Sequence, residues 1–403
     1  MTQSNDSTNV NTAVTLQLLE GSNELFPAMV ASINSANHSV QLETYIFDLT
    51  AGGATVATAL EQAAARGVLV RVMVDGFGTP YIPDEWMQRF KTAGVQLIIY
   101  EPIVTLGIFI PSQWRRLHRK LCVVDDTVAY CGGINVLDDW HDPSYGALTE
   151  PRFDFSVRAS GIVAQDIHKT TRELWERRSK GNHLAVKRVK TAIETLPRVL
   201  KRHHWQSHSH ADQPLAALVL RDNISNRGQI ERAYLKAIGD ARTDIIIANA
   251  YFVPGAKLRR ALIMAAKRGV KVQLLLQGKY EYFMQYHAAR PIYGPLLAAG
   301  IEIFEYDKSY LHAKVAVIDS VWATVGSSNL DPLSLLLARE ANIVMQDAVF
   351  AQSLRQRLQT AMVKEGKKVD ANLIKNRPWL QRANEVIAFV VMRIGLWLFG
   401  KKY

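Results

Sequence analysis

The chain has 403 residues, of which 48% are hydrophobic, enough for two domains or for one large domain built of two halves. Its formal net charge of +11 favours an anionic partner, such as nucleic acid, a phosphorylated metabolite or an acidic lipid surface, without choosing among them. Two cysteines exclude a disulfide framework, and we expect both to be buried thiols. No apolar run reaches the ~18 residues of a membrane span.

Residues 1–14 are polar, show no signal-peptide pattern, and are expected to be disordered. The remainder divides by composition and by an internal repeat. We predict a first half at 15–171, a basic connection at 172–214, a second half at 215–366, and an amphipathic, membrane-associated tail at 367–403.

The repeat covers successive predicted strands and helices of both halves. Its matched segments are VQLETYIFD (40–48) with IIIANAYFV (245–253), AAARGVLVRVMVDG (63–76) with AAKRGVKVQLLLQG (265–278), and AGVQLIIYE (93–101) with AGIEIFEYD (299–307). Strands alternating with helices predict an α/β fold of two duplicated halves with largely parallel sheets. In both halves the helix before the second strand is expected to end at an Arg-Gly step.

The first half contains about twelve residues that the second lacks. Gly94 precedes His118 by 24 residues, whereas Gly300 precedes His312 by 12. The additional residues lie within IVTLGIFIPSQWRR (103–116). An apolar segment followed by Trp and two Arg suits a membrane interface, and it also suits an ordinary surface loop that packs on the protein.

One short phrase occurs in both halves at equivalent positions. LHRKLCVVD (117–125) and LHAKVAVID (311–319) carry His, Lys and Asp at the same offsets. Side chains at i and i+2 of a strand share a face, so each copy presents an imidazole beside an ammonium group. The Asp lies at an odd offset, at the strand end, and we expect it to have a supporting role.

A basic segment precedes the second half, and an apolar segment follows it. Residues 172–202 hold ten Lys or Arg against three Glu, and the four histidines of KRHHWQSHSH (201–210) are more typical of a solvated linker than of a metal site. Near the C-terminus, 386–399 is apolar around Arg393 and too short to span a bilayer. An interfacial helix or a helix packed on the core both fit.

The two motifs of a duplicated chain can meet across a pseudo-two-fold axis at one active site. The predicted catalytic residues are His118, Lys120, Asp125, His312, Lys314 and Asp319. Asn135 and Asn329 each follow their histidine by seventeen residues, and Ser327 has Gly133 as its counterpart. Lysines and amides can hold phosphate oxygens, while one histidine attacks phosphorus and the other protonates the leaving oxygen.

A nucleophilic histidine needs a partner on its second ring nitrogen. We expect Glu340 to orient His312 and Asp154 to orient His118, each within its own half. No dense carboxylate cluster is visible for paired metal ions, so we predict neither a metal nor another cofactor.

The doubled H-x-K-x-x-x-x-D motif, each copy followed by G-[GS]-x-N, resembles the phospholipase D superfamily. The match extends from about residue 15 to about residue 400. The longer phrases ERAYLKAI, DIIIANAYFVPG and WATVGSSNLDPLSLLLAREANIV resemble bacterial cardiolipin synthases of the short form. This resemblance implies two α/β halves around one active site and a covalent phosphohistidine, with His118 as nucleophile and His312 as general acid. The opposite assignment stays open.

The reaction that this resemblance implies joins two phosphatidylglycerol molecules into cardiolipin and releases glycerol. It also implies an enzyme at the cytoplasmic side of the inner membrane, held peripherally on anionic phospholipid. A phospholipase D-type hydrolase or a nuclease would use the same chemistry. We expect no nucleic acid partner, because the apolar insertion and tail have no purpose on DNA.

Overall fold

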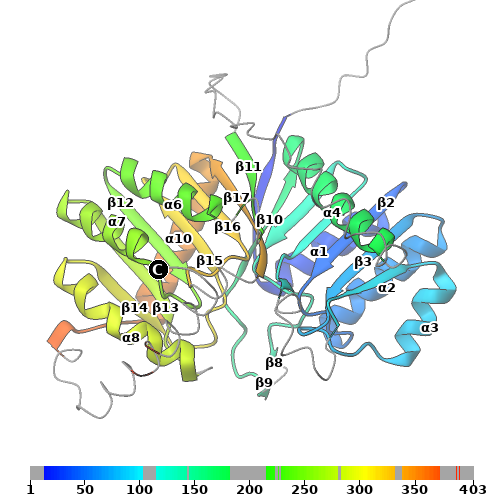
Figure 1. The fold of residues 1–403 in the computed structure, drawn as a ribbon, viewed down its shortest axis with the longest axis horizontal. Helices are drawn as coiled ribbons and strands as arrows, with labels where there is room; N and C mark the ends of the chain where they lie inside the picture. The colour runs from blue at the N-terminus through cyan, green and yellow to red at the C-terminus, as the bar shows by residue number, and fades with distance from the viewer. Residues whose placement is uncertain are drawn as a thin grey trace, which may run out of the picture.

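In the computed structural model, the chain folds into two α/β halves that face each other across a shared core (Figure 1). The structure describes residues 13–102, 115–142, 145–181, 215–222, 226, 228–279, 283–331, 338–372, 387 and 390. The apolar insertion, the histidine-rich connection and most of the C-terminal tail lie outside these residues.

A seven-stranded sheet forms the first half. In spatial order its strands are β1 (Leu16–Glu20), β10 (Phe155–Ser160), β7 (Val128–Gly132), β6 (Leu121–Val124), β2 (Ser39–Thr44), β3 (Leu69–Asp75) and β4 (Gln96–Tyr100). Its outer face is covered by α1 (Gly21–Asn34), α2 (Ala51–Ala65) and α3 (Asp84–Ala93). A small ribbon of β8 (His141–Asp142) and β9 (Gly146–Ala147) follows β7.

The second half repeats this arrangement in a nine-stranded sheet. Its path runs β11 (Leu215–Arg221), β17 (Ala338–Gln346), β16 (Trp322–Gly326), β15 (Lys314–Ile318), β12 (Asp244–Asn249), β13 (Lys271–Gln277), β14 (Glu302–Tyr306) and β18 (Gly366–Lys368), and β5 (Arg116–Leu117) joins beside β17. The outer helices are α6 (Gln229–Asp240), α7 (Ala256–Lys267) and α8 (Phe283–Ala298).

One hydrophobic core joins the halves. It contains inward-facing residues of both sheets together with one face each of α4 (Ile162–Gly181) and α10 (Ala348–Glu365). Figure 1 shows the two sheets on either side of this seam, with β10, β17 and β11 near its centre. Burial of so much apolar surface from both halves stabilises their mutual orientation, which any site between them requires.

The predicted α/β duplication is confirmed, but the prediction of largely parallel sheets is wrong. Only β2, β3 and β4, and likewise β12, β13 and β14, run parallel within the described sheets, apart from the short β5–β17 pair. The motif strands β6 and β15 pair antiparallel with β2 and β12 and continue through tight hairpins into β7 and β16. Short hairpins join antiparallel neighbours, whereas a parallel pair needs a long crossover.

The expected helix ends are confirmed. Arg66 and Arg268 cap α2 and α7, and Gly67 and Gly269 follow with φ of +91° and +90°, a conformation that favours glycine. The two thiols, Cys122 and Cys131, are buried as expected. The helix α4 runs through the boundary placed at 171, and β18 joins the start of the predicted tail to the second sheet.

Candidate active site

The two motifs lie at one edge of the paired sheets, which we call the site edge. There β2, β3, β12 and β13 end, and β6, β10, β15 and β17 begin, as their pairing directions require. His118 lies between β5 and β6, and His312 lies two residues before β15. Each histidine is anchored to the opposite half, because His118 N–H donates to the Arg339 carbonyl (3.1 Å) and His312 N–H to the Phe153 carbonyl (2.9 Å).

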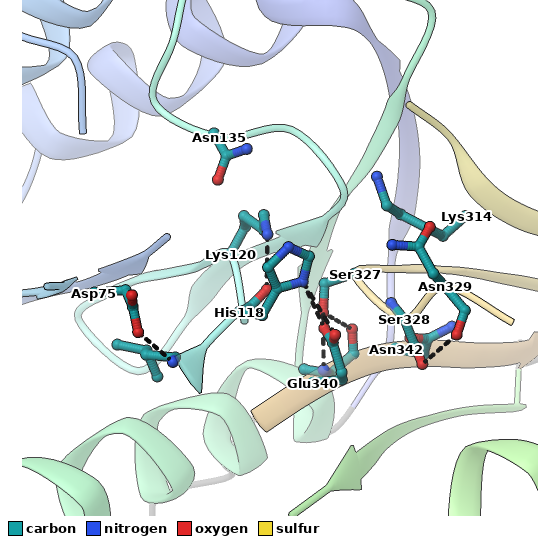
Figure 2. A network of polar contacts seen from close by, with 12 residues as sticks. Asp75, His118, Lys120, Asn135, Lys314, Ser327, Ser328, Asn329, Glu340 and Asn342 are labelled. Atoms are coloured by element: carbon teal, nitrogen blue, oxygen red, sulfur yellow. Dashed lines mark hydrogen bonds and ion pairs between the residues drawn. The ribbon is translucent and has the colours of Figure 1, made fainter. Parts of the chain in front are cut away.

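Each imidazole is held by a carboxylate of the other half. His118 Nδ1 lies 3.0 and 3.1 Å from the two carboxylate oxygens of Glu340, and His312 Nδ1 lies 2.6 Å from Asp154 Oδ2. Figure 2 shows the first of these contacts. The prediction that Glu340 orients His312 and Asp154 orients His118 is therefore wrong: the pairing is crossed.

Strand register across the seam explains the crossing. Arg339 of β17 pairs with Leu117 of β5, and a bridge joins Phe153 to Leu311. The next residues along each pair therefore meet: Glu340 faces His118, and Asp154 faces His312. A register between strands of different halves leaves no trace in the internal repeat.

The crossed pairs fix the tautomer that the chemistry needs. The carboxylates are 0% (Glu340) and 2% (Asp154) exposed, while the imidazoles are 18% (His118) and 20% (His312) exposed. A buried carboxylate accepts the Nδ1–H of its histidine, which leaves Nε2 directed away from it with a lone pair. Each half thus contributes one imidazole with an unprotonated Nε2 and one carboxylate that orients the imidazole of the other half.

The predicted lysines lie beside their histidines. Lys120 Nζ donates to the His118 carbonyl (2.8 Å), Lys314 Nζ donates to the His312 carbonyl, and Lys314 Nζ also lies 3.8 Å from Asp154. Both side chains are buried, at 6% and 0% exposure for the residues. Burial lowers the pKa of Lys120 to about 7. The Glu340 carboxylate opposes this shift, and the Lys314 ammonium adds to it.

The same environment acts on the imidazoles and on one carboxyl. Burial lowers the pKa of His118, against the opposing effect of Glu340, and burial with Lys314 and Lys120 lowers the pKa of His312 well below its usual value. Burial raises the pKa of Asp154 to about 6. A bound phosphodiester anion would reverse the trend for the histidines, since negative charge favours the imidazolium.

The supports of the two carboxylates differ. Ser327 Oγ donates to Glu340 (2.5 Å) and accepts the Ala341 N–H (3.1 Å). Its counterpart Gly133 has no side chain, and a Cβ there would collide with both carboxylate oxygens of Asp154. The shorter Asp therefore needs glycine at this position, whereas the longer Glu is braced by a serine hydroxyl.

Among the remaining predicted residues, Asn135 and Asn329 lie beside the lysines of their own halves (Figure 2). Asn135 Oδ1 accepts the Ile46 N–H (3.1 Å), whereas the buried Asn329 Oδ1 has no hydrogen-bond partner among the described residues. An asparagine with an oxygen left over at a phosphate site has hydrogen-bonding capacity for a ligand hydroxyl.

The motif aspartates serve the fold at the opposite ends of their strands. Asp125 and Asp319 have positive φ (49° and 53°) in the turns that follow β6 and β15. Each carboxylate accepts three successive backbone N–H groups from the loop that precedes the neighbouring strand, at 37–39 for Asp125 and 242–244 for Asp319. Hydrogen bonds of this kind lower the pKa of both groups, against the effect of burial.

Two positioning residues escaped the sequence analysis. Asp75, at the end of β3, accepts the Leu117 N–H (2.7 Å), and Gln277, at the end of β13, accepts the Leu311 N–H (3.0 Å). Each fixes the residue just before a motif histidine. The repeat aligns VMVDG with LLLQG, so the signal was present, but Asp and Gln share only an acceptor oxygen.

The geometry can be compared with known proteins. A family model described as "Cardiolipin synthase, PLD-like domain" matches residues 29–142 and 234–362. The chain belongs to this phospholipase D-like cardiolipin synthase family. Membership makes it an enzyme of the phospholipase D superfamily, as the doubled motif predicted.

Relatives in this family match nearly the whole chain. Cardiolipin synthase B of Salmonella typhimurium is 38% identical over 94% of this chain and 87% of its own length, and that of Escherichia coli K12 is 37% identical over the same shares. Cardiolipin synthase A of Cronobacter sakazakii is 29% identical, covering 92% of this chain and 73% of the relative.

Solved structures support the fold alone. Phosphatidylserine synthase of Haemophilus influenzae Rd KW20 superposes with a TM-score of 0.63 at 11% identity, covering 94% of this chain and 97% of that one. Polyphosphate kinase of Porphyromonas gingivalis has a TM-score of 0.56 at 12% identity, covering 95% and 53%.

Within the described ranges, no group of three or more His, Cys, Asp or Glu side chains is arranged to hold a metal ion. No helix in the described part of the chain is long and apolar enough to cross a bilayer.

Proposed function

We propose that this family member makes cardiolipin and glycerol from two phosphatidylglycerol molecules through a phosphatidyl-histidine intermediate. The observation that carries the proposal is the crossed arrangement, in which two imidazoles have Nδ1 bound by buried carboxylates and Nε2 available beside two buried lysines. Two positioned imidazoles and two ammonium groups suit a reaction in which a phosphodiester is first transferred to nitrogen and then to an alcohol.

In the first step, His118 Nε2 attacks the phosphorus of one phosphatidylglycerol. The N–P bond forms as the P–O bond to the glycerol headgroup breaks, and His312 Nε2–H gives its proton to the leaving oxygen. Lys120 and Lys314 stabilise the negative charge that develops on the non-bridging oxygens. The anionic diester itself raises the pKa of His312, so the general acid becomes protonated when substrate is present.

In the second step, a glycerol hydroxyl of another phosphatidylglycerol attacks the same phosphorus. Its proton passes to His312 Nε2, the N–P bond breaks, and cardiolipin leaves with His118 neutral again. Water at this step gives phosphatidic acid instead, so a transferase must exclude water and present a lipid alcohol at high effective concentration.

The carboxylates support this assignment of roles. Glu340 is held by the Ser327 hydroxyl and remains a fixed acceptor for the positive charge on a phosphorylated His118. Asp154, whose pKa burial raises to about 6, lies against His312, which suits a histidine that gives up and takes back a proton.

The proposed setting is the cytoplasmic face of the inner membrane, with the enzyme held peripherally on anionic phospholipid. The formal net charge of +11 supports an acidic surface as partner. Asp125 and Asp319 are assigned a supporting role rather than a chemical one, and we propose that neither a metal nor another cofactor is needed.

The test is to incubate the purified protein with phosphatidylglycerol vesicles in the presence of a chelator and to identify the products by mass spectrometry. Cardiolipin with an equal amount of glycerol supports the proposal. Phosphatidic acid without cardiolipin would make the protein a lipid hydrolase, and cleavage of nucleic acid without lipid turnover would make it a nuclease. His118→Ala and His312→Ala should both abolish turnover while the protein stays folded.

A further inference from the structure

Exposed aromatic side chains gather at the site edge. Among the described residues, the exposed aromatic side chains are Phe77 (62%), Tyr81 (65%), Trp140 (45%) and Tyr145 (53%). Phe77 and Tyr81 follow the end of β3, and Trp140 and Tyr145 border the β8–β9 ribbon that follows β7. Figure 1 shows this ribbon projecting between the two halves.

Contacts tie these side chains to the two motif segments. Phe77 N–H donates to Asp75 (2.8 Å), the residue that positions Leu117 beside His118. Tyr145 stacks on Tyr310, two residues before His312, with ring centroids 6.0 Å apart. Phe77 and Tyr145, both of the first half, therefore lie next to the segments that carry His118 and His312.

Cationic groups accompany the aromatic ones. Lys279 Nζ lies 5.8 Å from the ring centroid of Tyr310, and the Arg116 guanidinium, which is paired with the buried Asp75 (3.4 Å), lies 5.9 Å from that of Phe77. Aromatic rings mixed with Arg and Lys are typical of surfaces at the headgroup level of a bilayer, where one part of the side chain is apolar and the other is wet.

The opposite edge of the sheets differs in kind. Exposed apolar side chains in its turns and at its strand and helix starts are aliphatic, among them Leu69 (40%), Ile162 (43%), Leu215 (40%), Val321 (49%) and Val349 (81%). Exposed aliphatic residues are ordinary for a protein surface. The concentration of aromatic residues at one edge is therefore not a general property of this molecule.

We propose that the site edge docks on an anionic phospholipid bilayer, with Phe77, Tyr81, Trp140 and Tyr145 at headgroup depth and Lys279 among the phosphates. This docking surface rests on the proposed function, because it presents the histidines to lipids that stay in the bilayer. Donor and acceptor lipids then reach the site by lateral diffusion, and the bilayer covers the entrance against water.

A fluorescent label tests the orientation without reference to activity. Both native cysteines are buried, so Tyr81→Cys and the matched control Val321→Cys can each be labelled selectively with an environment-sensitive fluorophore. With vesicles of phosphatidylglycerol and phosphatidylcholine, we expect a blue shift and several-fold brighter emission for the label at 81, and no change at 321. An unchanged label at 81, or an equal response at 321, would overturn the proposal.

Two double variants test how much the aromatic side chains contribute to vesicle binding. Tyr81→Ser/Trp140→Ser should weaken cosedimentation with the same vesicles on the order of tenfold, while Ile162→Ser/Val321→Ser should leave it unchanged. Turnover of monomeric short-chain phosphatidylglycerol should be the same in both variants. Undiminished vesicle binding by the first variant, or its loss of turnover on monomeric lipid, would refute a docking role.

The two proposals fail separately. If labelled Tyr81→Cys shows the blue shift but the wild-type protein converts neither vesicular nor monomeric phosphatidylglycerol, the docking surface stands and the proposed reaction is wrong. If it converts monomeric lipid while the label at 81 stays unchanged on vesicles, the reaction stands and the docking surface is wrong.

Discussion

Replacing one carboxylate of each crossed pair should slow different chemical steps. Asp154→Asn removes the charged acceptor from His312, and Glu340→Gln removes it from His118. A hydrogen bond to a charged group is worth about 1.5–3 kcal/mol, which corresponds to about 10- to 150-fold in rate for the step that depends on it. The 2.6 Å contact and 2% exposure of Asp154 place its effect at the upper end of this range.

A phosphatidyl ester of p-nitrophenol separates the two steps. Its leaving group needs little protonation, so the attack by His118 proceeds without the general acid, whereas transfer from His118 still needs His312 as base. Asp154→Asn should therefore release a rapid burst of p-nitrophenol, one equivalent per enzyme, followed by slow turnover. Glu340→Gln should slow the burst itself.

The location of the trapped group completes the assay. Peptide mapping of Asp154→Asn after the burst should place the phosphatidyl group on His118, and both variants should unfold within a few degrees of the wild-type protein. A slowed burst in Asp154→Asn with a normal burst in Glu340→Gln would show either that the carboxylates act within their own halves or that the histidine roles are reversed. The mapped histidine distinguishes these two outcomes.

Three further predictions concern Lys120, Gly133 and Asp75. Lys120 binds fewer protons in the folded than in the unfolded state between pH 7 and its ordinary pKa, so stability should rise with pH through that window. Lys120→Met should therefore raise Tm at pH 6 while it lowers activity, and a lower Tm at that pH would contradict the argument. Gly133→Ser should displace Asp154 and lower activity at least ~10-fold. The double variant Gly133→Ser/Asp154→Glu copies the second half and should recover part of that activity. Full activity in Gly133→Ser would show that the site accommodates a side chain at 133 and would contradict the argument. Asp75→Asn keeps an acceptor for the Leu117 N–H and should retain most activity. Asp75→Ala should lower kcat about tenfold and leave vesicle binding normal. Equal activity in the two variants would contradict a positioning role for Asp75.

Much of this fold followed from the repeated pattern of the sequence. The motif phrases identified the two histidines and lysines, because an i, i+2 spacing on a strand has one geometric meaning. The glycine stops at Gly67 and Gly269 and the expected place of Asp125 and Asp319 at strand ends were likewise local properties of the chain.

Contacts between the halves were not predictable in this way. The assignment of Glu340 to His312 assumed that neighbours in sequence are neighbours in space, and the register at the seam reverses it. The prediction of strand direction failed for a related reason. Alternation of strands and helices does not reveal that each motif strand forms a hairpin with the strand after it and pairs antiparallel with the first parallel strand. Asp75 was overlooked because its partner is a backbone N–H, which has no sequence signature.

The crossed pairs also bear on how such a chain could have arisen. A single ancestral copy would hold a histidine whose carboxylate belonged to another molecule, so it could work only as a symmetric homodimer. In a homodimer both sites must carry the same residues. Once the two copies are joined in one gene, each copy can change separately. Gly133 with Asp154, against Ser327 with Glu340, is a divergence of this kind, and it falls on the residues that support the carboxylates of the two histidines.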